Sequence, residues 1–320
     1  MESNHTEVKM NRTGNISDCS SNSMHISVPC SLIAILVAGC ILNSVSLWIF
    51  FFRIKKWKTG VILQFNLALT DAIMMPAAPF MIVYFMLDGH WPFPQIFCQL
   101  KVFLMSTHLY GSIYFLMLIS MHRYVVVVRY KKKSILKDPV AIKRICIVVW
   151  TVLFVQGLPL FIFLKTSMIN NSIKCLNIHQ NEMTTLFFIY NTLFLLPSFL
   201  FPFLVSLVCY SILGCFICKK KPVKDKAVHT KSLQMITVSL IIFLICFAPL
   251  SITRTVGVVI KMWFPSFCEV LLKVEMGYYI SWTLTAANCC LDPILYCFAS
   301  ETFSAQFRTS LKNIKKRRKK

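Results

Sequence analysis

Seven long apolar stretches divide this sequence, and they limit the folds open to it more than any other feature. Each is long enough to cross a bilayer, which takes about 20 mostly apolar residues in a helix. Because 57% of the residues are hydrophobic and only 14% are charged, the composition excludes a soluble domain of this length. We therefore expect an all-α membrane protein whose seven transmembrane helices form one bundle. The stretches are Ser31–Phe52, Gly60–Leu87, Gln95–Val128, Val140–Leu164, Leu186–Cys218, Leu233–Met262 and Val270–Phe298.

Short connections between these stretches leave no room for a second globular domain. We expect residues 1–28 to form an extracellular glycosylated N-terminus and residues 29–300 to form the transmembrane domain. Residues 301–320 should form a short amphipathic helix and a basic cytoplasmic tail. Within that helix Phe303 and Phe307 lie one turn apart, so we expect them to rest along the membrane surface.

The positive charges indicate how the chain is oriented. Lys and Arg concentrate after the first, third and fifth stretches and in the tail, which by the positive-inside rule are cytoplasmic. This asymmetry accounts for the net charge of +22 without a nucleic-acid partner. We expect the terminal run Lys315–Lys320 to lie against anionic membrane lipids.

The segments expected outside the cell carry sequence signals typical of that location. Four Asn-X-Ser/Thr glycosylation motifs begin at Asn4, Asn11, Asn15 and Asn170. Of the 14 cysteines, five lie outside or at the outer mouth: Cys19, Cys30, Cys98, Cys175 and Cys268. We predict a disulfide between Cys98 and Cys175, which would pin the loop after the fourth stretch over the bundle. We predict another between Cys19 and Cys268, with Cys30 as the alternative to Cys19.

The seventh stretch places an acid beside a proline, Asp292 and Pro293, inside an apolar run. Proline removes a helical hydrogen bond, and a carboxylate in lipid is unfavourable by about 2.5–3.5 kcal/mol on insertion scales. A chain accepts both where a helix bends around a polar cavity.

Landmarks of this kind follow one another along the chain, which resembles the rhodopsin-like (class A) G-protein-coupled receptors over nearly its whole length. Asp292 and Phe247, together with Trp91–Phe93, resemble the branch that holds purinergic nucleotide, hydroxycarboxylic-acid and oxoeicosanoid receptors. The landmarks are Asn43, Leu67–Asp71, Cys98, His122–Tyr124, Trp150, Pro202, Tyr210, Phe243–Pro249 and Asp292–Tyr296.

The resemblance implies that Asp71, Ser112, Asn288 and Asp292 converge at mid-depth in the membrane. Two neighbouring carboxylates cannot both ionise without a cation or a shared proton, so we interpret them as a sodium-and-water pocket. The alternative is a static hydrogen-bonded network that braces the helices. His108, one turn from Ser112, is expected to be a packing residue rather than part of the pocket. No cofactor and no other metal are expected.

The resemblance also implies a site for G-protein coupling at the cytoplasmic end. Arg123 would receive the G protein, and Pro249 would supply the kink on which the sixth stretch pivots. His122 departs from the family, which usually has an acid there that restrains the neighbouring Arg, so we expect raised basal activity. The residues assigned to coupling and activation are His122, Arg123, Tyr124, Tyr210, Phe243, Phe247, Pro249, Pro293 and Tyr296.

For the ligand, the most informative residue is Arg254, because a guanidinium facing the cavity binds carboxylate or phosphate in a fork geometry. Its alternative role is an ion pair with a loop acid, Glu269 or Glu275. The family's hydroxycarboxylic-acid receptors would carry an Arg near Leu109, so that ligand class is disfavoured. Further anion contacts are Lys101, Lys174 and, near the rim, Lys273; the predicted apolar walls are Tyr84, Trp91, Tyr190, Tyr278, Tyr279 and Trp282.

Taken together, these features predict a plasma-membrane receptor for a small anionic extracellular ligand, namely a nucleotide, a carboxylic acid or an acidic lipid. It would signal through a heterotrimeric G protein of the inhibitory type, and it is not expected to be an enzyme. One alternative is an orphan or decoy receptor that binds without coupling. Another, from a different class, is a seven-span transporter.

Overall fold

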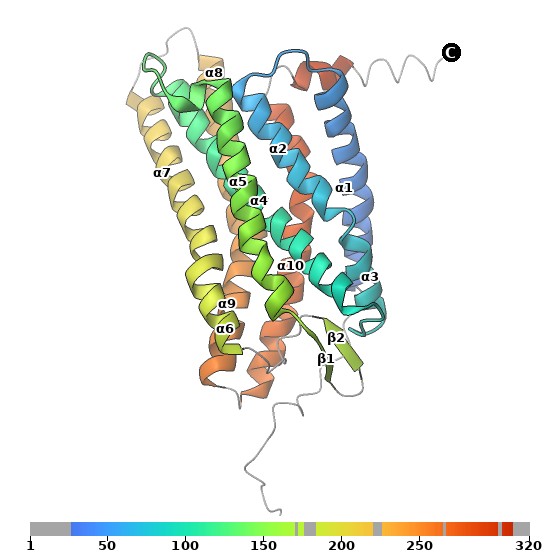
Figure 1. Ribbon diagram of the computed structural model, residues 1–320. Helices are drawn as coiled ribbons and strands as arrows, with labels where there is room; N and C mark the ends of the chain where they lie inside the picture. Colours follow the sequence, from blue (N-terminus) through green and yellow to red (C-terminus); the bar gives the residue numbers. More distant parts are fainter. Residues whose placement is uncertain are drawn as a thin grey trace, which may run out of the picture.

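The computed structural model describes residues 27–169, 172–175, 184–219, 226–264, 267–299 and 303–309. Its helices run along a common axis and form one bundle, so the predicted all-α membrane fold is confirmed (Figure 1). Six described stretches are long and apolar enough to cross a membrane. α10 (Cys268–Ala299) forms the seventh long helix of the bundle and packs along α1 (Ser27–Phe52), although its polar residues keep it out of those six.

Three of the predicted spans are interrupted, each beside a proline that lacks a backbone N–H. The second span divides at Pro76 into α2 (Thr59–Met74) and α3 (Ala78–Met86). Wider π-helical turns precede Pro197 and Pro249, where the fifth and sixth spans bend. The fifth span comprises α6 (Thr184–Tyr190), η3 (Asn191–Leu195) and α7 (Pro197–Lys219); the sixth comprises α8 (Lys226–Ile242), η4 (Phe243–Phe247) and α9 (Ala248–Trp263).

At one end of the bundle, which we call the hairpin end, β1 (Thr166–Ile169) and β2 (Ser172–Cys175) pair antiparallel (Figure 1). Cys175 forms the predicted disulfide with Cys98, and this bond ties β2 to the first turn of α4 (Gln95–Val127). The thiol of Cys30 is free. Cys19, the side chain of Cys268 and the predicted glycosylation sites Asn4, Asn11, Asn15 and Asn170 lie outside the described part of the chain.

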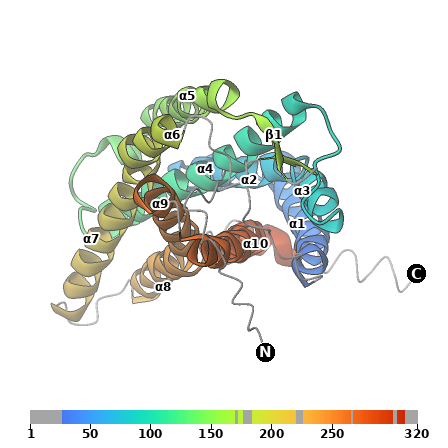
Figure 2. The same ribbon diagram turned by 90° about the horizontal axis from the view of Figure 1, so that it is seen from below.

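α4 lies at the centre of the bundle, between α2, α5 (Pro139–Phe163) and α7, as the view along the axis shows (Figure 2). α2 and α4 approach closely because Gly111 presents no side chain at their contact. A Cβ on Gly111 would lie 2.5 Å from Cγ2 of Thr70. Farther along α2, Asn66 accepts a hydrogen bond of 2.9 Å from the indole of Trp150 and so joins α2 to α5.

At the opposite end, a lysine and an acid join α4 to α5 across a 3-10 turn, η2 (Ile135–Lys137). The Lys137 ammonium donates to the carbonyls of Arg129, Tyr130 and Lys132 at 2.8, 2.8 and 3.0 Å. Asp138 caps α5 by accepting from two backbone amides of its first turn. The chain here therefore leaves one long helix and enters the next with its end groups hydrogen-bonded.

The expected amphipathic helix is present at residues 303–309, but its aromatic residues lie differently from the prediction. Phe303 is buried in the bundle, with its ring 5.1 Å from that of Phe50 and 5.7 Å from that of Tyr296. Phe307 stacks on Phe303 and is half-buried. The expectation that both lie along the membrane was therefore wrong for Phe303, because an apolar gap beside Tyr296 accepts its ring.

We predict that Gly111→Ala lowers the thermal stability of the purified protein in detergent. The added methyl would overlap Thr70, and overpacking of this kind destabilises by about 1–3 kcal/mol. Gly214→Ala is the matched control, because a Cβ at Gly214 meets nothing within 4 Å. Since alanine is favoured over glycine in a helix by about 0.5–1 kcal/mol, the control should be neutral or stabilising. Equal melting temperatures for the two variants would contradict the close contact between α2 and α4.

Candidate functional site

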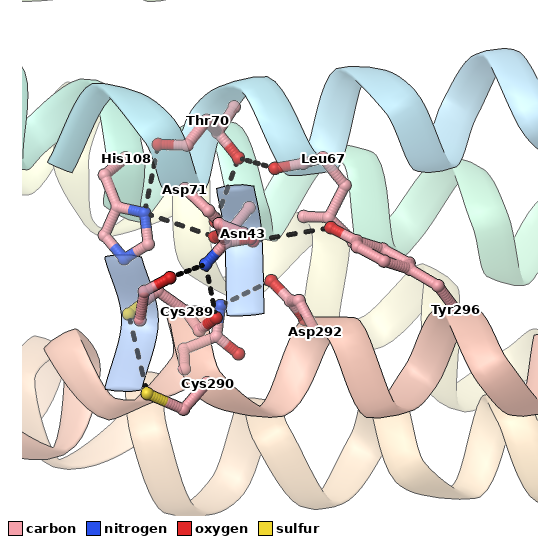
Figure 3. Close-up of polar contacts among 12 residues, drawn as sticks. Asn43, Leu67, Thr70, Asp71, His108, Cys289, Cys290, Asp292 and Tyr296 are labelled. Carbon is pink, nitrogen blue, oxygen red and sulfur yellow. Dashed lines mark hydrogen bonds and ion pairs between the residues drawn. The ribbon is translucent and has the colours of Figure 1, made fainter. Parts of the chain in front are cut away.

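Polar side chains from three helices meet in the middle of the bundle (Figure 3). Asp71 of α2 lies between His108 of α4, at 3.6 Å, and the hydroxyl of Tyr296 of α10, which donates to it at 3.4 Å. In α10, Asn288 donates to Asp292 at 2.9 Å. We call this group, with Thr70 and Ser112, the interior polar cluster; Thr70 and Ser112 lie 3.2 Å apart.

The four residues predicted for a sodium pocket thus lie close together, and all four are fully buried. His108 lies among them, contrary to its expected role as a packing residue. Its Nδ1 is 3.3 Å from the carbonyl oxygen of Thr70 as well as close to Asp71. The signal was its spacing of four residues from Ser112, which puts both side chains on one face of α4.

Several oxygens of this region have no hydrogen-bond donor within the described part of the chain. They are Oδ1 of Asn43, Asp71, Asn288 and Asp292. Asn43 reaches the cluster from α1, where its amide nitrogen donates to the carbonyl of Cys289 at 2.7 Å. Buried acceptors without a donor are unfavourable, and carboxylate and amide oxygens are the ligands that hard cations take. The donor set therefore fits a small cation.

Nearer the hairpin end, a second polar group surrounds Arg254 of α9. Its Nε donates to Asn191 Oδ1 at 3.0 Å, and its Nη2 donates to the Tyr110 hydroxyl at 2.5 Å. These partners come from η3 and α4, far away in sequence. We call Arg254, Asn191 and Tyr110 the arginine cluster. The guanidinium thus faces the interior, and Glu269, the loop acid proposed as an alternative partner, pairs instead with Lys273 at 2.7 Å.

Two lysines predicted as anion contacts are buried at the hairpin end. The Lys101 ammonium lies over the rings of Trp91 and Tyr84, at 4.9 and 5.4 Å from their centres, and pairs with no carboxylate among the described residues. Lys174 donates to the carbonyl of Asp88 at 3.1 Å. Burial lowers the pKa of Lys174, and the nearby Glu275 and Asp88 act in the opposite direction.

Most of the predicted aromatic walls surround one narrow cavity beside Lys101. Its free space is about 10 Å³, roughly enough for one water molecule. Tyr190 lies elsewhere, in a second cavity of similar size beside Tyr110, and its hydroxyl donates to the carbonyl of Gln156. The first cavity is lined by Met81, Tyr84, Lys101, Val102, Met105, Cys175, Tyr278, Tyr279 and Trp282.

The residues predicted for coupling occupy the end opposite the hairpin. His122 makes a 2.7 Å hydrogen bond with Thr59 at the start of α2. Arg123 Nε lies 3.0 Å from the sulfur of Met235 on α8. Tyr210 packs beside Leu213 and Ile236, and Tyr124 is half-buried. Tyr296, expected to close behind Arg123, instead has its hydroxyl on Asp71.

On the side of the interior polar cluster nearer the hairpin, the predicted aromatic pair lies within the bend of the sixth span. The rings of Phe243 and Phe247 are 5.8 Å apart and both are buried. Both residues belong to the π-helical turn that precedes Pro249. Pro293 lies inside the unbroken helix α10.

Sequence reasoning missed four of these partners: Thr59, Tyr110, Asn191 and Met235. Each belongs to an apolar or mixed run in which no spacing marks it. Their roles follow only from the packing of helices that are distant in sequence.

Comparison with known proteins identifies the class. Residues 42–296 match the family of 7 transmembrane receptors (rhodopsin family). The chain belongs to this family, and it is a multi-pass membrane receptor of the G-protein-coupled class and not an enzyme.

Among individual proteins the chain is similar to nucleotide receptors of the purinergic branch. It is 31% identical to mouse purinoceptor 4 over 294 residues, which cover 91% of this chain and 81% of the relative. It is 32% identical to human purinoceptor 2 over 280 residues, covering 87% and 74%. It is 29% identical to rat purinoceptor 1 over 295 residues, covering 91% and 78%.

Proposed function

We propose that this receptor binds a small anionic ligand, with a nucleotide as the first class to test, and activates a heterotrimeric G protein of the inhibitory type. The hairpin end would face outside, with the N-terminus, and the Arg123 end would face the cytoplasm. The observation that carries the proposal is the arginine cluster, in which a half-buried cation has only neutral partners among the described residues. The names of the relatives favour nucleotides over carboxylic acids and acidic lipids.

The arginine cluster supports an anionic ligand for an electrostatic reason. Arg254 has five N–H donors, and Asn191 and Tyr110 use two of them. A phosphate or carboxylate would accept from the remaining donors in a fork geometry and would balance the charge. Lys101 and Lys174 add positive charge toward the hairpin end, where a ligand with more than one phosphate could span the distance.

Ligand entry requires the aromatic walls to separate, since a space of about 10 Å³ holds no more than a water molecule. An agonist would therefore select a more open arrangement in which Tyr278, Tyr279 and Trp282 move apart. It shifts the population only to the extent that it binds this arrangement better than the closed one.

The bend in the sixth span offers a route from this region to the cytoplasmic end. Arg254 lies on α9, just beyond the π-helical turn η4, and Met235 lies on α8, before it. A pivot at Pro249 that moves α8 outward would break the contact between Met235 and Arg123. Arg123 would then be free to meet the G protein.

We also propose that the interior polar cluster holds a sodium ion in the resting receptor. The four oxygens without a donor among the described residues come from α1, α2 and α10, so an ion among them would hold these helices together. The ion would offset the repulsion between Asp71 and Asp292, and a movement of α10 would disperse its ligands.

Two alternatives to a coupled receptor follow from the sequence, and they stand differently. A decoy receptor gains some support from His122, which is tied to Thr59 in a family that usually has an acid beside this Arg. A seven-span transporter is set aside because the chain belongs to a receptor family.

We predict that Arg254→Ala reduces the potency of nucleotide agonists for G-protein dissociation in cells by about 10- to 100-fold. A hydrogen bond to a charged group contributes about 1.5–3 kcal/mol, which corresponds to this range. Lys273→Ala is the matched control, because this exposed cation of the same end pairs with Glu269 and should leave potency unchanged. Arg123→Ala should abolish the response at every concentration.

Each other outcome of this experiment has a defined meaning. Equal potency in Arg254→Ala and the unmodified receptor would contradict the anion site. Responses to acidic lipids or carboxylic acids alone would keep the anion site and reject nucleotides. Silence of the unmodified receptor at the cell surface, for the whole ligand panel, would favour the decoy function.

We predict that sodium raises the melting temperature of the purified receptor relative to an equal concentration of choline. The shift should disappear in Asp71→Asn, because binding to the folded state alone stabilises it by mass action. The matched control is Asp88→Asn, which neutralises an exposed acid at the hairpin end and should keep the shift. A sodium shift that survives in Asp71→Asn would contradict the site.

We predict that His122→Asp lowers basal G-protein dissociation, because a carboxylate beside Arg123 would hold this guanidinium in the resting state. His122→Asn removes the imidazole without adding charge, so its basal activity should stay closer to that of the unmodified receptor. Both variants should be compared at equal surface expression. Unchanged basal signalling in His122→Asp would refute the idea.

A further inference from the structure

The outward face of α7 is a continuous apolar stripe that ends in two cysteines. Phe201, Leu204, Val208 and Ile212 recur every three or four residues and are 63, 54, 55 and 40% exposed. In a membrane receptor, such a stripe faces lipid. Cys215 and Cys218 continue the same face through the last turn of the helix, and both are exposed free thiols.

The position of these thiols along α7 places them at a membrane surface. Lys219 follows directly and is exposed, and the sequence continues with Lys220 and Lys221. A run of lysines after an apolar helix marks the level of the lipid headgroups. This part of α7 is also uncrowded, since a Cβ added at Gly214 would meet nothing within 4 Å.

We propose that Cys215 and Cys218 form a site of S-acylation by long-chain fatty acids. Juxtamembrane cysteines beside basic residues are typical acceptors of this modification. The thiol sulfur attacks the carbonyl carbon of an acyl-coenzyme A, and a new thioester bond forms. The sulfur–carbon bond to coenzyme A breaks, and coenzyme A leaves as the free thiol with the proton lost by cysteine.

Other cysteines of the chain are poorer candidates. Cys146, Cys209 and Cys246 are buried, and Cys209 is on the same helix as the proposed site. Residues 298–320 contain no cysteine, so this part of the sequence cannot carry the lipid. The short helix at residues 303–309 is instead anchored by the buried ring of Phe303.

A metal site at the same pair of cysteines is less well supported. Two thiolates three residues apart need further ligands to complete a tetrahedral zinc site. No group of three or more His, Cys, Asp or Glu in the described part of the chain could hold a metal. An acyl chain needs no third ligand, and it would lie along the apolar stripe that already faces lipid.

Two acyl chains would hold the end of α7 in the bilayer. A single chain gives marginal membrane affinity, whereas two give stable anchoring. The inference rests on the proposed orientation, which puts this end of α7 in the cytoplasm, where acyl-coenzyme A is available. It is independent of the proposed ligand.

The test is acyl exchange on the full-length receptor expressed in cells. Free thiols are blocked, thioesters are cleaved with hydroxylamine, and the released thiols are labelled with a maleimide polyethylene glycol that adds a fixed mass. We expect up to two mass increments in the unmodified receptor, one in Cys215→Ser or Cys218→Ser, and none in the double variant. Cys30→Ser is the matched control, since Cys30 is an exposed free thiol near the start of α1.

The outcomes separate this inference from the proposed function. No hydroxylamine-dependent increment in the unmodified receptor, or increments that persist in the double variant, would overturn the acylation site. Loss of the increments in Cys30→Ser alone would overturn both the site and the proposed orientation. Increments that vanish in the double variant support the site even if Arg254→Ala leaves nucleotide potency unchanged, a result that would refute only the ligand proposal.

Discussion

Lipid offers no hydrogen bonds, and this constraint shapes every part of the receptor. Backbone groups must be satisfied within helices, and polar side chains must turn toward the centre of the bundle. The chain therefore places Asp71, Asp292 and Arg254 inside, where other side chains face them, while the outer face of α7 is apolar. Where proline removes a backbone donor, the spans widen into π-helical turns or divide. The interruptions at Pro197 and Pro249 follow from the same constraint.

Three polar centres are stacked along the bundle as a result. The arginine cluster lies toward the hairpin end, the interior polar cluster lies in the middle, and Arg123 lies at the opposite end. Helices rather than direct contacts connect them: the sixth span carries Arg254 on one side of its bend and the partner of Arg123 on the other. Tyr296 joins the interior polar cluster to the aromatic packing of Phe50 and Phe303. A shift of either helix would thus affect more than one centre.

Much of the fold and part of the site could be predicted because their signals are local or periodic. Apolar length marked the spans, and the placement of Cys98 and Cys175 marked their disulfide. The residue types at Asp71 and Asp292 indicated a shared polar interior. His108 and Phe303 were predicted less well, since a histidine on a helix and a phenylalanine near a terminus have many common environments. What decided them was a neighbour from another helix, Asp71 in one case and Phe50 in the other.

By itself, the sequence determined that seven helices cross a membrane, where the bundle carries its charge, and which residues cannot face lipid. These properties depend on composition and period, which act over one helix at a time. The tertiary structure alone decided that Arg254 meets Tyr110 and Asn191, that His122 meets Thr59, and that the cavity beside Lys101 is narrow. Such contacts depend on how far each helix is rotated and shifted against its neighbours, and that position is a balance of packing over the whole bundle.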